Sequence, residues 1–241
     1  MDKSNSNQPS GLISKYFPHY PAKPIAVTTA YDYPFAKILD ESGIDIVLVG
    51  DSLGMVVLGY DTTLPVTVSD MTYHTAAVAR AVKNALVVAD MPYRSYGTSA
   101  AAVKNAKLLK KFGAQAVKLE GGAVIQKQIA AILKAGIPVM GHLGMTPQSV
   151  EKLGGYKVQG KSKDAASLML EQAIACEQES SGAAGRLQNT SVFNKRAWDY
   201  SCSCSRGRCF TSTGNGRFHQ GSQQIISQDC GAQFAVRRKS A

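Results

Sequence analysis

The sequence predicts an α/β protein in which helices wrap a parallel sheet, and it favours a (β/α)8 TIM barrel. Short apolar runs alternate with helical patterns, and no hairpin pattern separates neighbouring runs. Five strand–helix units fill about 160 residues, so eight would need about the 250 residues typical of a closed barrel. The spacing therefore favours a barrel over an open doubly wound sheet, although only five units are readable.

Each predicted strand is a short apolar run suited to burial on both faces of a parallel sheet. The strands are predicted at Ile25–Thr29, Ile44–Val49, Leu86–Ala89, Ala116–Leu119 and Pro138–Gly141. Helical periodicity fills the intervals and follows the last strand. The helices are predicted at about Tyr33–Ser42, Asp70–Val82, Ser99–Phe112, Val124–Ala135 and Asp164–Glu177.

Capping residues mark several ends of these helices. Gly43, Gly113 and Gly136 follow three helices, at the position where a left-handed C-cap residue is expected. Ser69 and Thr98 precede two helices, at the position expected for an N-cap.

The composition divides the chain into two unequal parts. Residues 1–185 carry 18 Lys and Arg against 15 Asp and Glu, a net charge of +3, whereas residues 186–241 carry nine against two, a net charge of +7. Four of the five cysteines and only five Leu, Ile or Val residues lie in this last part. We therefore expect an N-terminal extension over 1–21, a catalytic barrel part over 22–180, and a basic tail over 181–241 that is lost from the barrel fold or disordered.

The N-terminus has the features of neither a signal peptide nor a transit peptide, and no apolar run reaches the length of a membrane span. We therefore expect a cytoplasmic protein with no membrane partner. The basic tail has no nucleic-acid-binding motif and no amphipathic stripe, so we expect no nucleic acid partner.

Polar residues stand at the carboxyl ends of four predicted strands. Asp51 and Ser52 follow the second strand, and Asp90 follows the third. The fourth contains Lys118 and ends at Glu120, while the fifth ends at His142. A single residue of this kind is more often a turn former or an exposed side chain. Parallel topology, however, brings all these ends to the one face where barrel active sites form. Carboxylates without a nearby Cys or a paired His favour Mg²⁺ over zinc, and Mg²⁺ can bind a 2-oxo acid.

Two other patterns do not fit the sites that they resemble. The stretch 155–162 matches a phosphate-binding loop, but no buried strand leads into it, so we interpret it as a Gly-flanked active-site loop. Cys202, Cys204 and Cys209 lack the paired C-x₂-C spacing of structural zinc sites.

Seven phrases carry a specific resemblance over about residues 22–178. They are Thr29–Tyr33, Val49–Gly54, Thr63–Thr67, Ala89–Pro92, Val117–Gly122, Gly141–Gln148 and Gly154–Gly160. In their order and spacing they resemble the 3-methyl-2-oxobutanoate (ketopantoate) hydroxymethyltransferase family.

The resemblance implies a Mg²⁺-dependent barrel of the pyruvate-binding type. It implies transfer of a hydroxymethyl group from 5,10-methylenetetrahydrofolate to 3-methyl-2-oxobutanoate, which gives 2-dehydropantoate for pantothenate biosynthesis. Asp51 and Asp90 would bind Mg²⁺ and contribute to substrate binding, with Glu120 completing the metal site. Ser52 and Lys118 would bind the oxo-acid, and His142 would be the catalytic residue of the pocket. The resemblance also implies a homo-oligomer.

The sequence departs from the family where its general-base Glu is expected, in a phrase like Val-Leu-Glu after the helix that ends near Glu177. The chain has no Glu after Glu179. We hypothesise that the divergent segment arises from a shift of the reading frame at about residues 178–186, or alternatively from an alternative exon. We also expect the activity to be impaired. Two other functions remain open: a Mg²⁺-dependent C–C lyase or mutase acting on another 2-oxo acid, and a non-catalytic truncated product with a basic tail.

Overall fold

The structure, a computed structural model, describes residues 25–149, 155, 159–160, 162–182, 190–196, 200–205 and 208–209. All five predicted strands form, and neighbours in sequence pair in parallel. They are β1 (Val27–Thr29), β2 (Ile46–Val49), β3 (Leu86–Asp90), β4 (Ala116–Glu120) and β5 (Val139–Gly144). This order confirms the sequence-predicted succession of strand–helix units.

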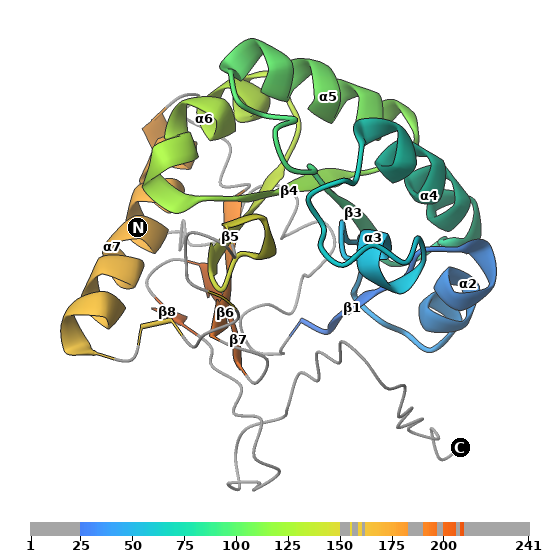
Figure 1. The fold of residues 1–241 in the computed structure, drawn as a ribbon, viewed down its shortest axis with the longest axis horizontal. Coiled ribbons are helices and arrows are strands. Elements are labelled where there is room, and N and C mark those ends of the chain that lie inside the picture. The colour runs from blue at the N-terminus through green and yellow to red at the C-terminus, as the bar shows by residue number, and fades with distance from the viewer. Residues whose placement is uncertain are drawn as a thin grey trace, which may run out of the picture.

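The five predicted helices also form, and Figure 1 shows them as an arc around one side of the curled sheet. They are α2 (Tyr33–Glu41), α4 (Val68–Ala81), α5 (Ser99–Lys111), α6 (Gln126–Lys134) and α7 (Lys163–Gly182). Three short elements that the periodicity did not predict follow the carboxyl ends of strands. They are α3 (Leu53–Val56) after β2, η1 (Gly122–Ile125) after β4 and η2 (Pro147–Ser149) after β5.

The N-caps differ from expectation at one helix. Thr98 caps α5 as predicted, since its side chain accepts a hydrogen bond from the Ala101 N–H at 3.2 Å. The cap of α4 is Thr67 and not Ser69: Thr67 and Asp70 each accept a hydrogen bond from the other's backbone N–H. This reciprocal capping box satisfies two N–H groups, which favours the earlier start.

The sheet continues beyond the five predicted strands. β6 (Thr190–Arg196) pairs in parallel with β5, from Val139 opposite Thr190 to Gly144 opposite Lys195. β7 (Tyr200–Ser205) and β8 (Arg208–Cys209) follow in antiparallel pairing. Among the described strands the order runs from β1 to β8 with no pairing of β8 back to β1, so the sheet is a curled half-barrel. The boundary at residue 181 stays a prediction, and the extension 1–21 lies outside the described residues.

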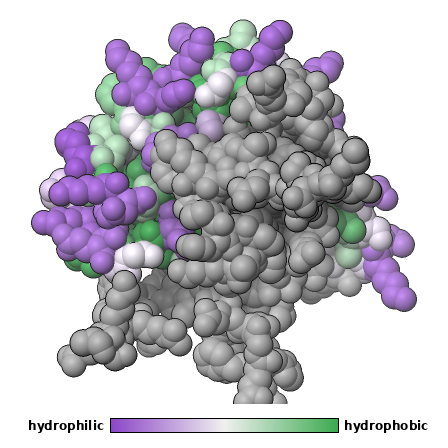
Figure 2. Space-filling model, turned by 180° about the vertical axis from the view of Figure 1, so that it is seen from behind, coloured by the Kyte–Doolittle hydropathy of each residue, from purple (hydrophilic) through white to green (hydrophobic). Residues whose placement is uncertain are grey.

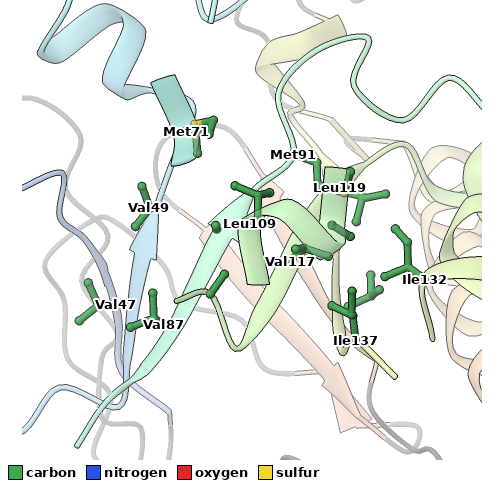
Figure 3. Packing of buried hydrophobic residues seen from close by; sticks show 14 of the residues in the cluster. Val47, Val49, Met71, Val87, Met91, Leu109, Val117, Leu119, Ile132 and Ile137 are labelled. Atoms are coloured by element: carbon green, nitrogen blue, oxygen red, sulfur yellow. The ribbon is translucent and has the colours of Figure 1, made fainter. Parts of the chain in front are cut away.

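Alternation along the strands separates two apolar faces. Val47, Val49, Val117 and Leu119 lie in the large core that the helices cover, together with Leu109 and Ile132 from α5 and α6, as Figure 3 shows. The residues between them form a smaller cluster on the inner side of the curl. It comprises Ile46, Leu86, Val88, Ala116 and Met140. Hydrophilic side chains gather along the outer rim of the described part in Figure 2.

Gly113 allows α4 to approach the turn that follows α5. Its φ is +108°, and a Cβ there would lie 2.3 Å from the Ala79 Cβ. Gly43 is a matched control, because its φ is +81° but a Cβ would meet nothing within 4 Å. Gly43→Ala should therefore lower the free energy of unfolding only by the about 1–2 kcal/mol that a left-handed backbone costs a residue with a Cβ. Gly113→Ala should lower the free energy of unfolding by about 1–3 kcal/mol more than that, because the added methyl group would overpack against Ala79. Urea unfolding measures both, and equal losses would contradict the close approach.

Asp40 anchors α2 to the start of β3. Its carboxylate accepts hydrogen bonds from the backbone N–H groups of Lys83 (3.0 Å), Asn84 (2.9 Å) and Ala85 (2.8 Å). Burial alone would raise the pKa of Asp40, but these hydrogen bonds outweigh it and lower the pKa. The anchor therefore ties the amino end of a central strand to the helical layer.

A lowered folded-state pKa means that Asp40 stabilises the protein above the unfolded pKa, and that this contribution is lost as the pH falls through the folded pKa. Asp40→Ala should lower the free energy of unfolding by about 3 kcal/mol at pH 7, because three backbone N–H groups lose their charged acceptor. The difference in unfolding free energy between the two chains should shrink as the pH falls from 5 toward 2. A difference that is independent of pH would contradict the role of the charge.

Candidate functional site: carboxylates at the strand ends

Strand register brings four of the predicted site residues together. Asp90 of β3 lies opposite Lys118 of β4, and Glu120 of β4 lies opposite His142 of β5. All four are on the strand face that continues the inner apolar cluster, because they follow its members at intervals of two residues. The polar group is therefore the carboxyl end of the inner face.

These cross-strand neighbours are in direct contact. The Lys118 Nζ lies 2.7 Å from the Asp90 Oδ1 and 3.9 Å from the Glu120 Oε1. The His142 Nδ1 lies 2.9 Å from the same Glu120 Oε1. All four residues are only 3–5% exposed, so these charges interact in a largely water-free environment.

Asp51 and Ser52 join the group from the loop that follows β2. The Asp51 N–H donates a hydrogen bond to the Asp90 Oδ2 at 3.1 Å. A Cβ at Gly50 would lie 2.7 Å from the Ser52 Oγ, so a larger residue there would displace the Ser52 hydroxyl. The Ser52 hydroxyl is 2.8 Å from the Tyr31 hydroxyl, which comes from the loop after β1. The structure thus brings together all six residues predicted for the site.

Two residues of the same cluster were not predicted as site residues. Gln148, in η2, donates from its amide to the Asp51 Oδ2 at 2.7 Å, and Tyr96 donates to the Gln148 Oε1 at 2.5 Å. Gln148 is buried, and Tyr96 is half-buried. Both belong to loops at the carboxyl ends of strands, so loop position on this face was the available indication.

Burial and crowding of like charges shift the acidities of the carboxyl groups. Burial, then the charges of Asp90 and Glu120, raise the pKa of Asp51 well above its ordinary value. Burial also raises the pKa of Asp90, although Lys118 opposes this. Burial lowers the pKa of His142, and the charge of Lys118 lowers it further. His142 is therefore neutral near pH 7, and its Nδ1–H donates to Glu120.

The donor set fits a divalent cation. Three buried carboxylates face one buried ammonium group, so the ionised cluster carries a net charge of −2 that a divalent ion would balance. Carboxylate oxygens are hard ligands that suit Mg²⁺. In the described part of the chain, no three His, Cys, Asp or Glu side chains are arranged around one ion position.

Glu120 already has partners for both of its oxygens. Oε1 accepts from His142, and Oε2 accepts from the Gln148 N–H at 3.0 Å. Burial would raise its pKa, but its interaction with His142 and the charge of Lys118 lower it. A direct contact between Glu120 and the metal stays a prediction.

Other predictions fall outside the described residues. Half of the loop 155–162, namely 156–158 and 161, and all residues after 209 belong to this group. The position where a general-base Glu was sought, residues 183–189, lies outside them as well. Within the described residues, no helix is both long and apolar enough to cross a membrane.

The fold and the position of this site define the class of protein. Parallel strands wrapped by helices, with polar groups at the carboxyl ends, are the arrangement of barrel enzymes. The chain is similar in structure to a putative phosphonomutase from Burkholderia cenocepacia J2315 (TM-score 0.52, 17% identity, covering 70% of this chain and 68% of that chain). It is also similar to phosphoenolpyruvate phosphomutase from Streptomyces platensis subsp. rosaceus (TM-score 0.51, 16% identity, 65% of this chain and 57% of that chain). At these identities the likeness shows the fold alone.

The sequence comparisons then identify the family. A model of the family described as Ketopantoate hydroxymethyltransferase matches residues 17–185, so the chain belongs to this family. It is 59% identical over 156 residues to 3-methyl-2-oxobutanoate hydroxymethyltransferase from Thermoanaerobacter sp. (strain X514), covering 64% of this chain. It is 56% identical over 157 residues to the enzyme of that name from Heliobacterium modesticaldum, again covering 64% of this chain. The chain spans 57% of the length of each of these two relatives.

Proposed function

We propose that the chain binds 3-methyl-2-oxobutanoate together with Mg²⁺, as the oxo-acid half of a 3-methyl-2-oxobutanoate hydroxymethyltransferase site. The observation that carries this proposal is the buried group of three carboxylates, one lysine and one histidine at the ends of β2 to β5. It belongs to a chain that is 56–59% identical to enzymes of that name. The second substrate would be 5,10-methylenetetrahydrofolate, and the product 2-dehydropantoate.

The acidic and basic residues of the site would have different roles. Asp51 and Asp90 would hold Mg²⁺, and Glu120 would support the site through His142 and Gln148. When bound, Mg²⁺ supplies Lewis-acid polarisation of the keto group, which makes the C3 proton more acidic.

Lys118 would neutralise the carboxylate of the oxo-acid. Burial alone would lower the pKa of Lys118, but Asp90, Glu120 and Asp51 outweigh it and raise the pKa, so the amine stays charged. The Ser52 hydroxyl, held by Tyr31, could donate a hydrogen bond to the substrate. His142, neutral and oriented by Glu120, would line the pocket and could move a proton at Nε2.

The reaction removes the C3 proton from the oxo-acid and forms a new C–C bond from C3 to the methylene carbon of the folate. Both C–N bonds of that methylene carbon break, and water supplies the hydroxyl oxygen. The C3 proton and the two protons of water are shared among the new hydroxyl and the two folate nitrogens, which gives tetrahydrofolate. The family's general base has no counterpart in this sequence after Glu179. We therefore propose that the chain binds the oxo-acid and transfers the one-carbon unit slowly. The proposal places the chain in the cytoplasm, as a homo-oligomer.

A direct assay separates this function from a lyase or mutase reaction on another 2-oxo acid. The chain would be incubated with Mg²⁺, 3-methyl-2-oxobutanoate and 5,10-methylenetetrahydrofolate, and the release of tetrahydrofolate would be followed. In parallel, cleavage of a panel of other 2-oxo acids would be measured. Folate-dependent formation of 2-dehydropantoate supports the proposal. Cleavage of another oxo-acid without any transfer to 3-methyl-2-oxobutanoate would overturn it.

A further inference from the structure

The Gln148 side chain links parts of the molecule that are far apart in sequence. It is 7% exposed, and its Nε2 donates to the Asp51 Oδ2 at 2.7 Å and to the Met91 carbonyl at 3.0 Å. Its Oε1 accepts from the Tyr96 hydroxyl at 2.5 Å. One amide from the loop after β5 therefore contacts the loop after β2 and the loop between β3 and α5.

The chemistry of these partners fixes the orientation of the amide. The Asp51 carboxylate and the Met91 carbonyl are acceptors, so both must face the NH₂ group. Oε1 then faces Tyr96, whose hydroxyl can donate. Turning the amide over would place its oxygen against two acceptors and lose these hydrogen bonds.

The backbone of Gln148 extends the network to the other side of the site. Its N–H donates to the Glu120 Oε2 at 3.0 Å, while the Glu120 Oε1 is 2.9 Å from the His142 Nδ1. Gln148 therefore connects Asp51 on one side with the Glu120–His142 pair on the other. These residues come from the carboxyl ends of three different strands.

We propose that Gln148 is a positioning residue that fixes the carboxylate of Asp51 for Mg²⁺, with Tyr96 holding the amide in place. The inference rests on the proposed function, because it assigns Asp51 as a Mg²⁺ ligand. Gln148 engages Oδ2 and so fixes the orientation of the carboxylate that would hold the ion. Groups that orient metal ligands in this way typically change metal affinity about 10–100-fold when they are removed.

The test uses Gln148→Met, which keeps the length of the side chain and removes all three of its hydrogen bonds. Mg²⁺ would be titrated calorimetrically into the full chain in the presence of 3-methyl-2-oxobutanoate. We expect Mg²⁺ affinity to fall about 10–100-fold. Because Gln148 acts through the metal ligand, the affinity for the oxo-acid should return to that of the unmodified chain at saturating Mg²⁺.

Two further variants keep the inference testable if Gln148→Met folds poorly. Tyr96→Phe removes the hydroxyl that donates to the Gln148 Oε1 and that also lies 3.1 Å from the Glu120 carbonyl oxygen, while it leaves the hydrogen bonds of the Gln148 Nε2 in place. Mg²⁺ affinity should therefore fall by less than tenfold, in the same direction. Asn105→Leu is the matched control. Its amide donates to the Ser95 carbonyl at 2.6 Å, in the same loop as Tyr96. It should lower the melting temperature and leave Mg²⁺ affinity unchanged.

The outcomes separate the inference from the proposed function. If the unmodified chain binds no Mg²⁺, the proposed function fails, and the role of Gln148 fails with it. If the unmodified chain binds Mg²⁺ but Gln148→Met and Tyr96→Phe bind it within twofold of the unmodified value, only the positioning role is overturned. A loss of affinity in Asn105→Leu equal to that in Tyr96→Phe would also overturn it, because general loop stability would then be the cause.

Discussion

Replacing Asp90 with asparagine should abolish Mg²⁺-dependent binding of 3-methyl-2-oxobutanoate, with a loss of affinity greater than about 100-fold. The reason is that a site with few protein ligands loses a charged oxygen, and a direct ligand should cost more than a residue that only orients one. The variant also removes the negative charge that lies 2.7 Å from the Lys118 Nζ. The measurement is calorimetric titration of the oxo-acid at fixed Mg²⁺.

Asp45→Asn is the matched control for this variant. Asp45 precedes β2, at the end of the sheet opposite to the site, and its carboxylate accepts from the Ala26 N–H at 2.7 Å. Asparagine keeps an acceptor oxygen there, so oxo-acid binding should not change. Unaltered Mg²⁺ dependence in Asp90→Asn, with the control behaving as expected, would contradict the assignment of Asp90.

A chimera that restores the family's C-terminal half should transfer the one-carbon unit about 10²–10⁴ times faster than this chain, because that factor is typical of a general base. In the chimera, residues from 183 onward would be replaced by the corresponding part of the Thermoanaerobacter sp. (strain X514) relative, which is 59% identical over the matched region. Tetrahydrofolate release and deuterium exchange at C3 of the oxo-acid would be compared.

The control is the same chimera with its general-base Glu changed to Gln. Its rate should fall back toward that of the present chain, while its affinity for the oxo-acid should stay the same. Equal rates for the present chain and the chimera would show that the missing carboxylate is not needed, and would contradict the predicted impairment.

Most of the described fold could be predicted from periodicity, because buried parallel strands and amphipathic helices have distinct patterns. The short elements could not: α3, at Leu53–Val56, has only four residues, too few to show a helical period. β6 was also missed, because Thr190–Arg196 mixes polar and apolar residues and has no continuous apolar run. Its pairing with β5 depends on register rather than on composition.

The residues of the candidate site also separate into those that could be predicted from the sequence and those that could not. Asp90, Lys118, Glu120 and His142 could be predicted because strand ends in a parallel sheet share one face, and the register confirms that they are neighbours. Gln148 and Tyr96 could not be assigned to the site, because they lie in loops whose path depends on tertiary packing. Their contact spans 52 positions of the sequence, and no local pattern indicates it.

The most direct measurement of the central claim is calorimetric titration of 3-methyl-2-oxobutanoate into the unmodified chain, with Mg²⁺ and again with EDTA. The three buried carboxylates of the candidate site and the buried ammonium group of Lys118 predict saturable binding of one oxo-acid per chain with Mg²⁺, and none once the metal is removed. Binding of equal affinity in EDTA, or no binding in either condition, would contradict a Mg²⁺-dependent oxo-acid site formed by Asp51, Asp90 and Lys118.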